Sequence, residues 1–201
     1  WAMQKDENAS QDDYVALQKS FIEENIDNVL GLNAFLQAYY YFQPQEVIDL
    51  VNAMPEAAQE KTSFIKESAE KALKVLPGNP YIDVVEKNPD GKEISLKSVV
   101  ENKKNKYILL DFWSRGCGPC ILAIPEMGEL ASIYKDKLNI VSISTDNKKM
   151  WEEASEAHPM SWNNWNDLNG TAGLYANYDQ GAIPAYTLIS PEGIVLEQWV
   201  G

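Results

Sequence analysis

The feature that most constrains the fold is an apolar segment that runs almost directly into two closely spaced cysteines. Residues 106–113 read Lys-Tyr-Ile-Leu-Leu-Asp-Phe-Trp, and their apolar, β-branched and aromatic content predicts a buried strand. Cys117-Gly-Pro-Cys120 follows, and Ile121-Leu-Ala-Ile124 after it predicts a helix. The two cysteines, which are the only ones in the chain, are therefore expected at a turn from a strand into a helix.

This turn should give the two sulfurs different environments. The first residue of a helix faces solvent and the unpaired N–H groups of the first turn, whereas a residue three positions later points back toward the sheet. Cys117 is thus predicted to be an exposed nucleophile with a lowered pKa, and Cys120 a buried resolving thiol. Pro119 suits the first helical turn, because the N–H that it lacks would be unpaired there.

A zinc site and a purely structural disulfide are the alternatives to redox chemistry at this pair. Zinc takes four ligands, and His158, the only histidine, has no other Cys or His near it at ligand spacing. A structural bridge from Cys117 to Cys120 would close a very short loop and add little stability on the loop-entropy argument. The sequence favours a redox pair, with no metal and no cofactor besides the Cys117–Cys120 disulfide itself.

Four separated features make the chain similar to the thioredoxin superfamily. Asp111 lies six residues before the first cysteine, a Gly-Pro dipeptide lies between the cysteines, and Pro125 follows the second cysteine by five residues. Gly181-Ala-Ile-Pro184, before the apolar residues 185–190, resembles the Ile-cis-Pro entry to a strand in that family. The resemblance covers about residues 81–201. It implies an α/β, thioredoxin-like fold with a central mixed β-sheet flanked by helices.

Within the superfamily the chain looks most like the TlpA/ResA-like envelope thiol-disulfide oxidoreductases of the Bacteroidetes type, which are often labelled AhpC/TSA-like. The cues are a small all-helical segment ahead of the domain, a hairpin at Asn88-Pro-Asp-Gly91 followed by Ile94-Ser-Leu96, and an insertion that carries Trp151, Trp162 and Trp165. Gly116 and Ile121 depart from the family pattern, which has Trp before the first cysteine and usually a basic residue after the second.

Asp111 is conspicuous because it shares one face of the predicted strand with Leu109 and Trp113, and that strand should be buried on both faces. Near the end of a strand, such an Asp can simply accept a hydrogen bond from a backbone group. The functional interpretation is a desolvated acid with a raised pKa, placed beneath Cys120 to take its proton.

Pro184 and the residues around the cysteines form the predicted substrate-binding surface. In this fold a cis-Pro presents the backbone of the preceding residue, here Ile183, for pairing with an extended substrate segment. An ordinary trans-Pro at the start of an edge strand is the alternative. Arg115 would supply positive charge near Cys117, or it is a solvated surface residue. The predicted binding residues are Ile183, Pro184, Trp113, Gly116, Gly118 and Pro119.

Helical spacing and chain breakers divide the sequence into two parts, residues 1–78 and 79–201. In the first part we expect one long helix from Asp12, bent at Gly31, a short helix from Pro44, and a third from Thr62 to about Leu76. In the second part we expect a series of strands and helices, with His158, Trp151 and 163–166 in a surface insertion. The strands are expected near 81–86, 92–96, 106–113, 139–145, 185–190 and 193–199, and the helices near 117–134, 147–157 and 171–176. The natural protein is expected to be longer at both ends, with a last helix beyond Gly201.

Composition narrows the possible partners. The chain has 17 Lys and Arg against 30 Asp and Glu, a formal net charge of −13, which disfavours nucleic acid as a partner. The resemblance implies instead a periplasmic or cell-envelope reductase of protein disulfides that depends on a separate electron donor, with a lipid anchor on the full-length protein and a homodimer through the helical segment as options. A thiol peroxidase is one alternative, although no Thr-x-x-Cys arrangement precedes either cysteine. The other is a non-catalytic, thioredoxin-like binding module, which Gly116 and Ile121 leave open.

Overall fold

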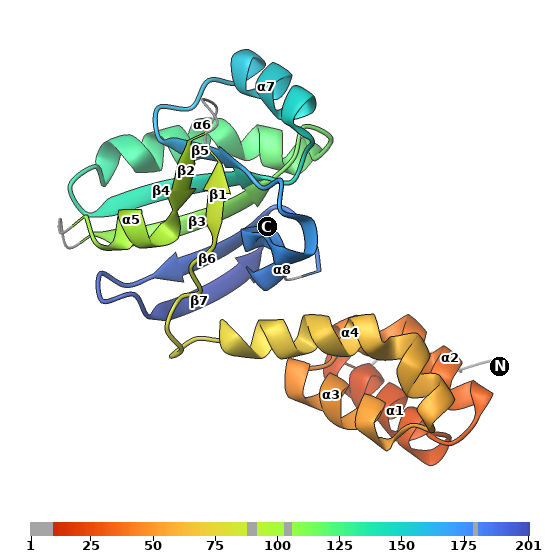
Figure 1. The fold of residues 1–201 in the computed structure, drawn as a ribbon. Coiled ribbons are helices and arrows are strands. Elements are labelled where there is room, and N and C mark those ends of the chain that lie inside the picture. The colour runs from red at the N-terminus through yellow and green to blue at the C-terminus, as the bar shows by residue number, and fades with distance from the viewer. Residues whose placement is uncertain (1–9, 88–91, 103–105, 179–180) are drawn as a thin grey trace. The chain divides into compact units, whose positions relative to one another are not determined.

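The computed structural model describes residues 10–87, 92–102, 106–178 and 181–201, and the chain forms two compact units, Trp1–Leu73 and Lys74–Gly201 (Figure 1). Among the described residues, no helix is both long enough and apolar enough to cross a membrane. The predicted hairpin at Asn88–Gly91 lies outside the described residues.

In its described residues the first unit is helical, as predicted. Its elements are α1 (Gln11–Glu24), α2 (Val29–Ala38), the 3-10 turn η1 (Tyr39–Tyr41), α3 (Pro44–Ala53) and α4 (Glu56–Lys74). Their inward faces form a separate apolar core, with Ile22, Phe35 and Val51 fully buried.

The expectation of one long helix bent at Gly31 is wrong. The first helix ends at Asn25, and a new helix begins after Asn28, whose side-chain oxygen accepts a hydrogen bond from the backbone N–H of Leu30 at 2.8 Å. An Asn in this position satisfies an N–H that the new helix would otherwise leave unpaired. Gly31 lies inside α2, so the chain does not bend there; the break comes at residues 25–28, where Asn28 caps the new helix.

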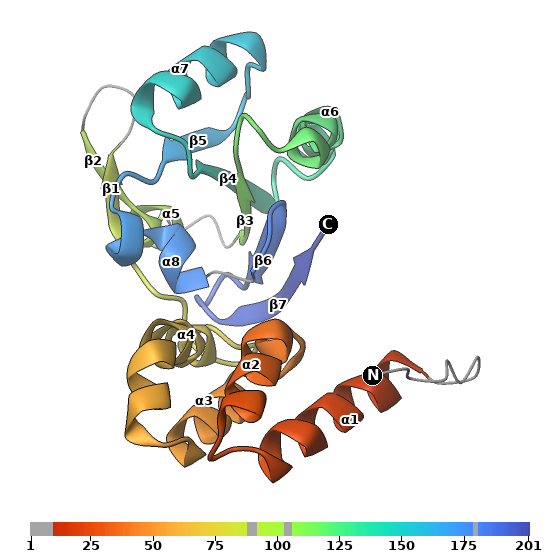
Figure 2. The ribbon, with the colours of Figure 1, turned by 90° about the vertical axis from the view of Figure 1, so that its right-hand side faces the viewer.

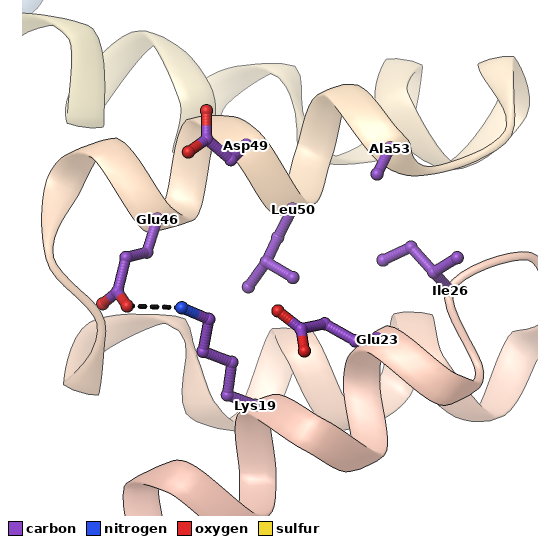
Figure 3. A pocket seen from close by; sticks show the side chains of 7 residues that line it. All are labelled: Lys19, Glu23, Ile26, Glu46, Asp49, Leu50 and Ala53. Atoms are coloured by element: carbon purple, nitrogen blue, oxygen red, sulfur yellow. Dashed lines mark hydrogen bonds and ion pairs between the residues drawn. The ribbon is translucent and has the colours of Figure 1, made fainter.

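A hollow of about 290 Å³ lies between α1 and α3 (Figure 3). An ion pair crosses it, from Lys19 Nζ to Glu46 Oε1 at 2.5 Å. The hollow is lined by Lys19, Glu23, Ile26, Glu46, Asp49, Leu50 and Ala53. All seven belong to the helical unit, so this hollow contains neither cysteine.

The second unit is built on a seven-stranded sheet with the order β2-β1-β5-β4-β3-β6-β7. The strand bounds are β1 (Val85–Lys87), β2 (Glu93–Ser95), β3 (Tyr107–Trp113), β4 (Leu138–Ser144), β5 (Asn163–Asn166), β6 (Ala185–Ile189) and β7 (Val195–Val200). The central strand β3 runs parallel to β4 and antiparallel to β6, which gives the mixed sheet that the sequence predicts.

Helices cover both faces of this sheet. They are α5 (Leu96–Val100), α6 (Gly118–Ile133), α7 (Lys148–Ala157) and α8 (Leu174–Tyr178), with the 3-10 turn η2 (Gly170–Ala172). Figure 2 shows α6 on one side of the sheet and α5 and α8 on the other. On the α5 and α8 side, Leu110 and Phe112 of β3 are fully buried, and on the α6 side Leu109 packs against Met127.

The surface insertion expected around residues 163–166 is instead the strand β5. It pairs in parallel with β4 and antiparallel with β1, and Trp165 is 5% exposed. Trp151, expected in the same insertion, is also buried. Three of the four β5 residues are asparagines, which are rare in strands, so local propensity indicated a loop. Long-range pairing overrides that propensity here.

Candidate active site

The two cysteines form a disulfide at the start of α6. The Sγ–Sγ distance is 1.97 Å and the Cα atoms are 5.2 Å apart. Cys117 is the N-cap of the helix, Pro119 lies in the first turn, and the backbone N–H of Cys120 donates a hydrogen bond to Cys117 Sγ at 3.2 Å. An unpaired N–H at a helix start thus reaches the sulfur that the sequence predicts to be the nucleophile.

The predicted contrast in exposure between the two cysteines is small in this disulfide state. Cys117 is 8% exposed and Cys120 is 3% exposed, so both are largely buried, and the expectation of an exposed Cys117 is wrong here. Trp113, Trp151 and Ala154 pack around the pair. As a helix cap, the Cys117 sulfur turns toward the first-turn amides, which explains why little of it reaches solvent.

Asp111 is buried in the strand next to this helix, with 5% of its surface exposed. Burial raises the pKa of its carboxyl group to about 6, because water no longer solvates the charged form. A hydrogen bond from Ser142 Oγ to Asp111 Oδ2, 2.6 Å long, acts in the opposite direction by favouring the carboxylate. The group that donates to this acid is thus a side chain on β4 and not the backbone.

Ile183 lies beside the disulfide, and the peptide bond between it and Pro184 is cis. Ile183 is half-buried and packs against the cluster that contains both cysteines, whereas Pro184 is buried. Gly116, Gly118 and Pro119 are exposed. Five of the six predicted binding residues therefore surround the disulfide from the turn and from the segment before β6.

Trp113 is placed differently from the other predicted binding residues. Its side chain is 1% exposed and packs behind the cysteines with Trp151, so it lies in the core and not on the surface. Because it lines the inner side of the disulfide, Trp113 supports the cysteines and does not present a face for substrate.

The positive charge of Arg115 is already paired. Its guanidinium Nη1 lies 2.5 Å from Glu153 Oε2, and its backbone N–H donates to Asp146 Oδ2 at 2.6 Å. The expectation that Arg115 supplies positive charge to Cys117 therefore weakens, because a carboxylate neutralises that charge locally.

Sequence reasoning missed the partners of Asp111. Ser142 is fully buried on β4, and the indole Nε1–H of Trp162 donates to its Oγ at 2.8 Å. The signal was present in the sequence, because Ser142 is a polar residue inside a strand expected to be buried on both faces. The same argument that singled out Asp111 applies to it.

A second buried carboxyl group was also missed. Glu86 on β1 is 1% exposed, and its two oxygens accept hydrogen bonds from the backbone N–H of Leu174 at 3.0 Å and from Asn169 Nδ2 at 2.8 Å. Burial, followed by the negative charge of Asp167, raises its pKa to about 7. This carboxyl group is hydrogen-bonded to the first residue of α8, the short helix that precedes the Ile183 segment in the sequence.

Across the described residues, no cluster of three or more His, Cys, Asp and Glu side chains could hold a metal ion.

Comparisons with known proteins agree with this geometry. A profile of the AhpC/TSA family matches residues 77–198. The thiol-disulfide oxidoreductase ResA of Bacillus thuringiensis is 30% identical over 118 residues, which are 56% of this chain and 62% of the relative. The thioredoxin domain of a thiol-disulfide oxidoreductase from Bacteroides vulgatus has a TM-score of 0.54 and 25% identity, with 62% of this chain and 89% of that chain covered. A thioredoxin-like protein from Bacteroides caccae has a TM-score of 0.63 and 22% identity, with 92% of this chain and 73% of that chain covered.

These matches confirm the predicted thioredoxin-like fold and the predicted kinship. The chain spans 62% of the length of the curated ResA relative that it matches. The Bacteroides caccae structure shows similarity of fold alone, and its match includes most of this chain. Because the family profile matches more than half of its residues, the chain belongs to the AhpC/TSA family.

Proposed function

We propose that this protein is a thiol-disulfide oxidoreductase that reduces disulfides of extracytoplasmic proteins. The observation that carries the proposal is the Cys117–Cys120 disulfide at the first turn of α6, beside a strand that buries an acid, Asp111. The names of the ResA relative and of the Bacteroides vulgatus structure support the same activity.

The reaction begins from the reduced dithiol. The Cys117 thiolate attacks one sulfur of a substrate disulfide, so that the substrate S–S bond breaks, a mixed disulfide forms and a substrate thiolate leaves. Cys120 then attacks Cys117 Sγ, which restores the Cys117–Cys120 disulfide and releases the second substrate thiol. The substrate gains two electrons and two protons, and a separate dithiol donor must return two electrons to the protein.

Asp111 serves the second step. Cys120 reacts as a thiolate, so its proton must leave as the sulfur attacks, and the Asp111 carboxylate accepts it directly or through water. A pKa of about 6 suits this task, because the group is mostly ionised at neutral pH and yet basic enough to hold a proton. No cofactor besides the dithiol is required.

Protein disulfides are the proposed substrates, and the periplasm or cell envelope is the proposed location. An extended substrate segment would pair with the backbone at Ile183, next to Pro184, with Gly116, Gly118 and Pro119 on the other side of the cysteines. Disulfides persist in that compartment, so a reductase there has substrates but needs a dedicated supply of electrons. A lipid anchor and a homodimer through the helical unit are compatible with this proposal.

Trapping experiments test the proposed roles. In Cys120→Ser, a mixed disulfide on Cys117 cannot be resolved, so we expect covalent adducts with disulfide-bonded peptides that disappear on addition of a reductant. Cys117→Ser is the matched control and should form few adducts, because the first attack is lost. Adducts on Cys117→Ser in place of Cys120→Ser would reverse the assignment of roles.

The same proteins separate the alternatives. A thiol peroxidase would consume peroxide faster than it exchanges with disulfides, and a non-catalytic binding module would bind peptides without forming adducts. Either result would contradict the proposed activity.

A further inference from the structure

A short chain of side chains leads from the indole of Trp162 to the buried acid Asp111. Trp162 Nε1–H donates to Ser142 Oγ at 2.8 Å, and Ser142 Oγ–H donates to Asp111 Oδ2 at 2.6 Å. Trp162 is half-buried, whereas Ser142 is fully buried and Asp111 is 5% exposed. The chain therefore starts near the surface and ends at the carboxyl group beside α6.

The order of donors fixes the direction of the hydroxyl hydrogen. An indole N–H can only donate, so it uses an acceptor site of Ser142 Oγ. A serine hydroxyl has one hydrogen, and with the indole on its acceptor side that hydrogen is directed to Asp111 Oδ2. A hydrogen bond donated to a carboxylate favours the charged form over the protonated form.

The other groups that face Asp111 do not replace this hydrogen bond. Tyr186 on β6 is paired directly opposite Asp111 in the sheet, and Glu126 on α6 acts on Tyr186 as a further negative charge. The Cys117–Cys120 disulfide lies at the start of α6 and carries no charge. Burial favours the neutral acid, and the interaction that opposes burial is the one from Ser142.

We propose that Ser142 and Trp162 are positioning residues that direct one hydrogen bond onto Asp111 and so keep this acid ready to accept the proton of Cys120 at neutral pH. This inference rests on the proposed function, because it assigns two further residues to the same proton transfer. In the transfer, the proton moves from Cys120 Sγ to Asp111 as Cys120 Sγ bonds to Cys117 Sγ and the substrate sulfur leaves with the electron pair of the broken bond.

Two single variants test the proposal, and two further variants serve as a control and a rescue. Ser142→Ala removes the hydroxyl donor, and Trp162→Phe keeps an aromatic ring but frees the serine hydroxyl to rotate. Thr187→Val is the matched control, because it removes another buried hydroxyl of the same sheet, one that accepts a hydrogen bond from Gln198 Nε2 at 3.2 Å. Ser142→Thr retains a hydroxyl and should restore the behaviour of the wild type.

Two readouts are measured against pH. The first is the infrared C=O band of protonated Asp111 in the oxidised protein, identified by its loss in Asp111→Asn. The second is the single-turnover rate at which a preformed mixed disulfide on Cys117 is resolved. A hydrogen bond to a charged group corresponds to roughly one to two pH units, so we expect both midpoints to rise by about one unit in Ser142→Ala, by less in Trp162→Phe, and not at all in Thr187→Val. At pH 7 the resolution rate should fall about twofold in Ser142→Ala, because a midpoint near 7 leaves about half of Asp111 protonated.

An infrared midpoint in Ser142→Ala equal to that of the wild type would overturn the proposal, even in a protein that reduces disulfides well. A shifted infrared midpoint with unchanged resolution kinetics would also overturn it, because the hydrogen bond would then have no part in the reaction. If the wild type forms no mixed disulfide at all, the proposed function fails. The infrared midpoints still report separately whether Ser142 acts on Asp111. Should Ser142→Ala not fold, the comparison of Trp162→Phe with Thr187→Val decides alone.

Discussion

Asp111 and Glu86 are buried carboxyl groups of the second unit with raised pKa values, but the structure uses them differently. Asp111 lies on β3, the strand that leads to the cysteines, and accepts a hydrogen bond from a side chain. Glu86 instead accepts one hydrogen bond from the backbone of α8 and one from Asn169, which together tie β1 to the segment that precedes Ile183. Burial is the main cause of both shifts. The first acid is therefore a candidate for chemistry, and the second is a structural tie whose strength depends on pH.

Glu86 should make the stability of the second unit depend on pH. Its pKa is about 7 in the folded state against an ordinary value of 4.5, so the folded protein binds this proton more tightly than the unfolded chain does. The free energy of unfolding should then fall as pH rises from about 4.5 to about 7, by on the order of 3 kcal/mol at most. Asp111 adds a change of the same sign between about 4 and 6.

Urea unfolding at several pH values measures this dependence. Glu86→Gln should flatten the decline above pH 5, and Glu93→Gln, which changes an exposed glutamate on the neighbouring strand β2, should leave it as in the wild type. A decline in Glu86→Gln as steep as that of the wild type would show that another group is responsible.

At the scale of elements, the sequence predicts best where the pattern is local and strong. The segment 106–113 and the helix after Cys117 appear within one or two residues of their predicted positions, because the strand has a long apolar pattern and the helix has a proline in its first turn. Strand β5 was missed because its four residues have little strand propensity and form a strand only through pairing with β4 and β1. Such pairing is not encoded in the segment itself.

The break between α1 and α2 was missed in the sequence for a different reason. The apolar spacing continues across residues 25–28, so the pattern alone favours one helix. A side-chain cap at Asn28 and the close approach of Gly31 to the backbone of Asn25 decide the structure instead.

The same limits apply to the candidate site. The cysteines and Asp111 could be predicted from strand and helix patterns, whereas the hydrogen bond from Trp162 to Ser142 joins residues twenty positions apart and depends on the tertiary structure.

The close approach at Gly31 gives a test of this break. A Cβ at Gly31 would lie 2.1 Å from the backbone oxygen of Asn25, so the chain must shift to accommodate it. We expect Gly31→Ala to destabilise the helical unit by about 1–3 kcal/mol, as overpacking does. Gly128→Ala in α6 is the matched control, since its Cβ would meet the Trp162 ring at an ordinary 3.6 Å and should stabilise that helix by up to about 1 kcal/mol.

Urea unfolding followed by circular dichroism compares the two variants. Equal unfolding midpoints for Gly31→Ala and the wild type would contradict the described packing of α1 against α2.

At the scale of the whole molecule, the chain is acidic and forms two units, and the predicted redox chemistry lies in the second of them. The predicted catalytic and binding residues all lie in Lys74–Gly201, whereas the hollow of the first unit is lined by residues of the helical unit. The charges near the disulfide also determine which redox state is favoured. Arg115 is paired with Glu153, Pro119 has no N–H to donate, and Asp111 is a buried acid on the strand that leads to the cysteines.

From these features we predict only modest stabilisation of the Cys117 thiolate, and therefore a reducing couple. A strongly oxidising dithiol has a very acidic first thiol, which stabilises its reduced form, as in DsbA at about −120 mV against about −270 mV for thioredoxin. The backbone hydrogen bond from Cys120 to Cys117 Sγ supports the thiolate, and the neighbouring carboxylate of Asp111 opposes it.

Equilibration of the protein with glutathione buffers, read out by thiol alkylation and mass, tests the central claim most directly. We predict a two-electron transition at Cys117 and Cys120 with a midpoint near the thioredoxin value of about −270 mV. A midpoint near the DsbA value of about −120 mV would contradict the account, because the protein would then donate disulfides to its substrates and not reduce them.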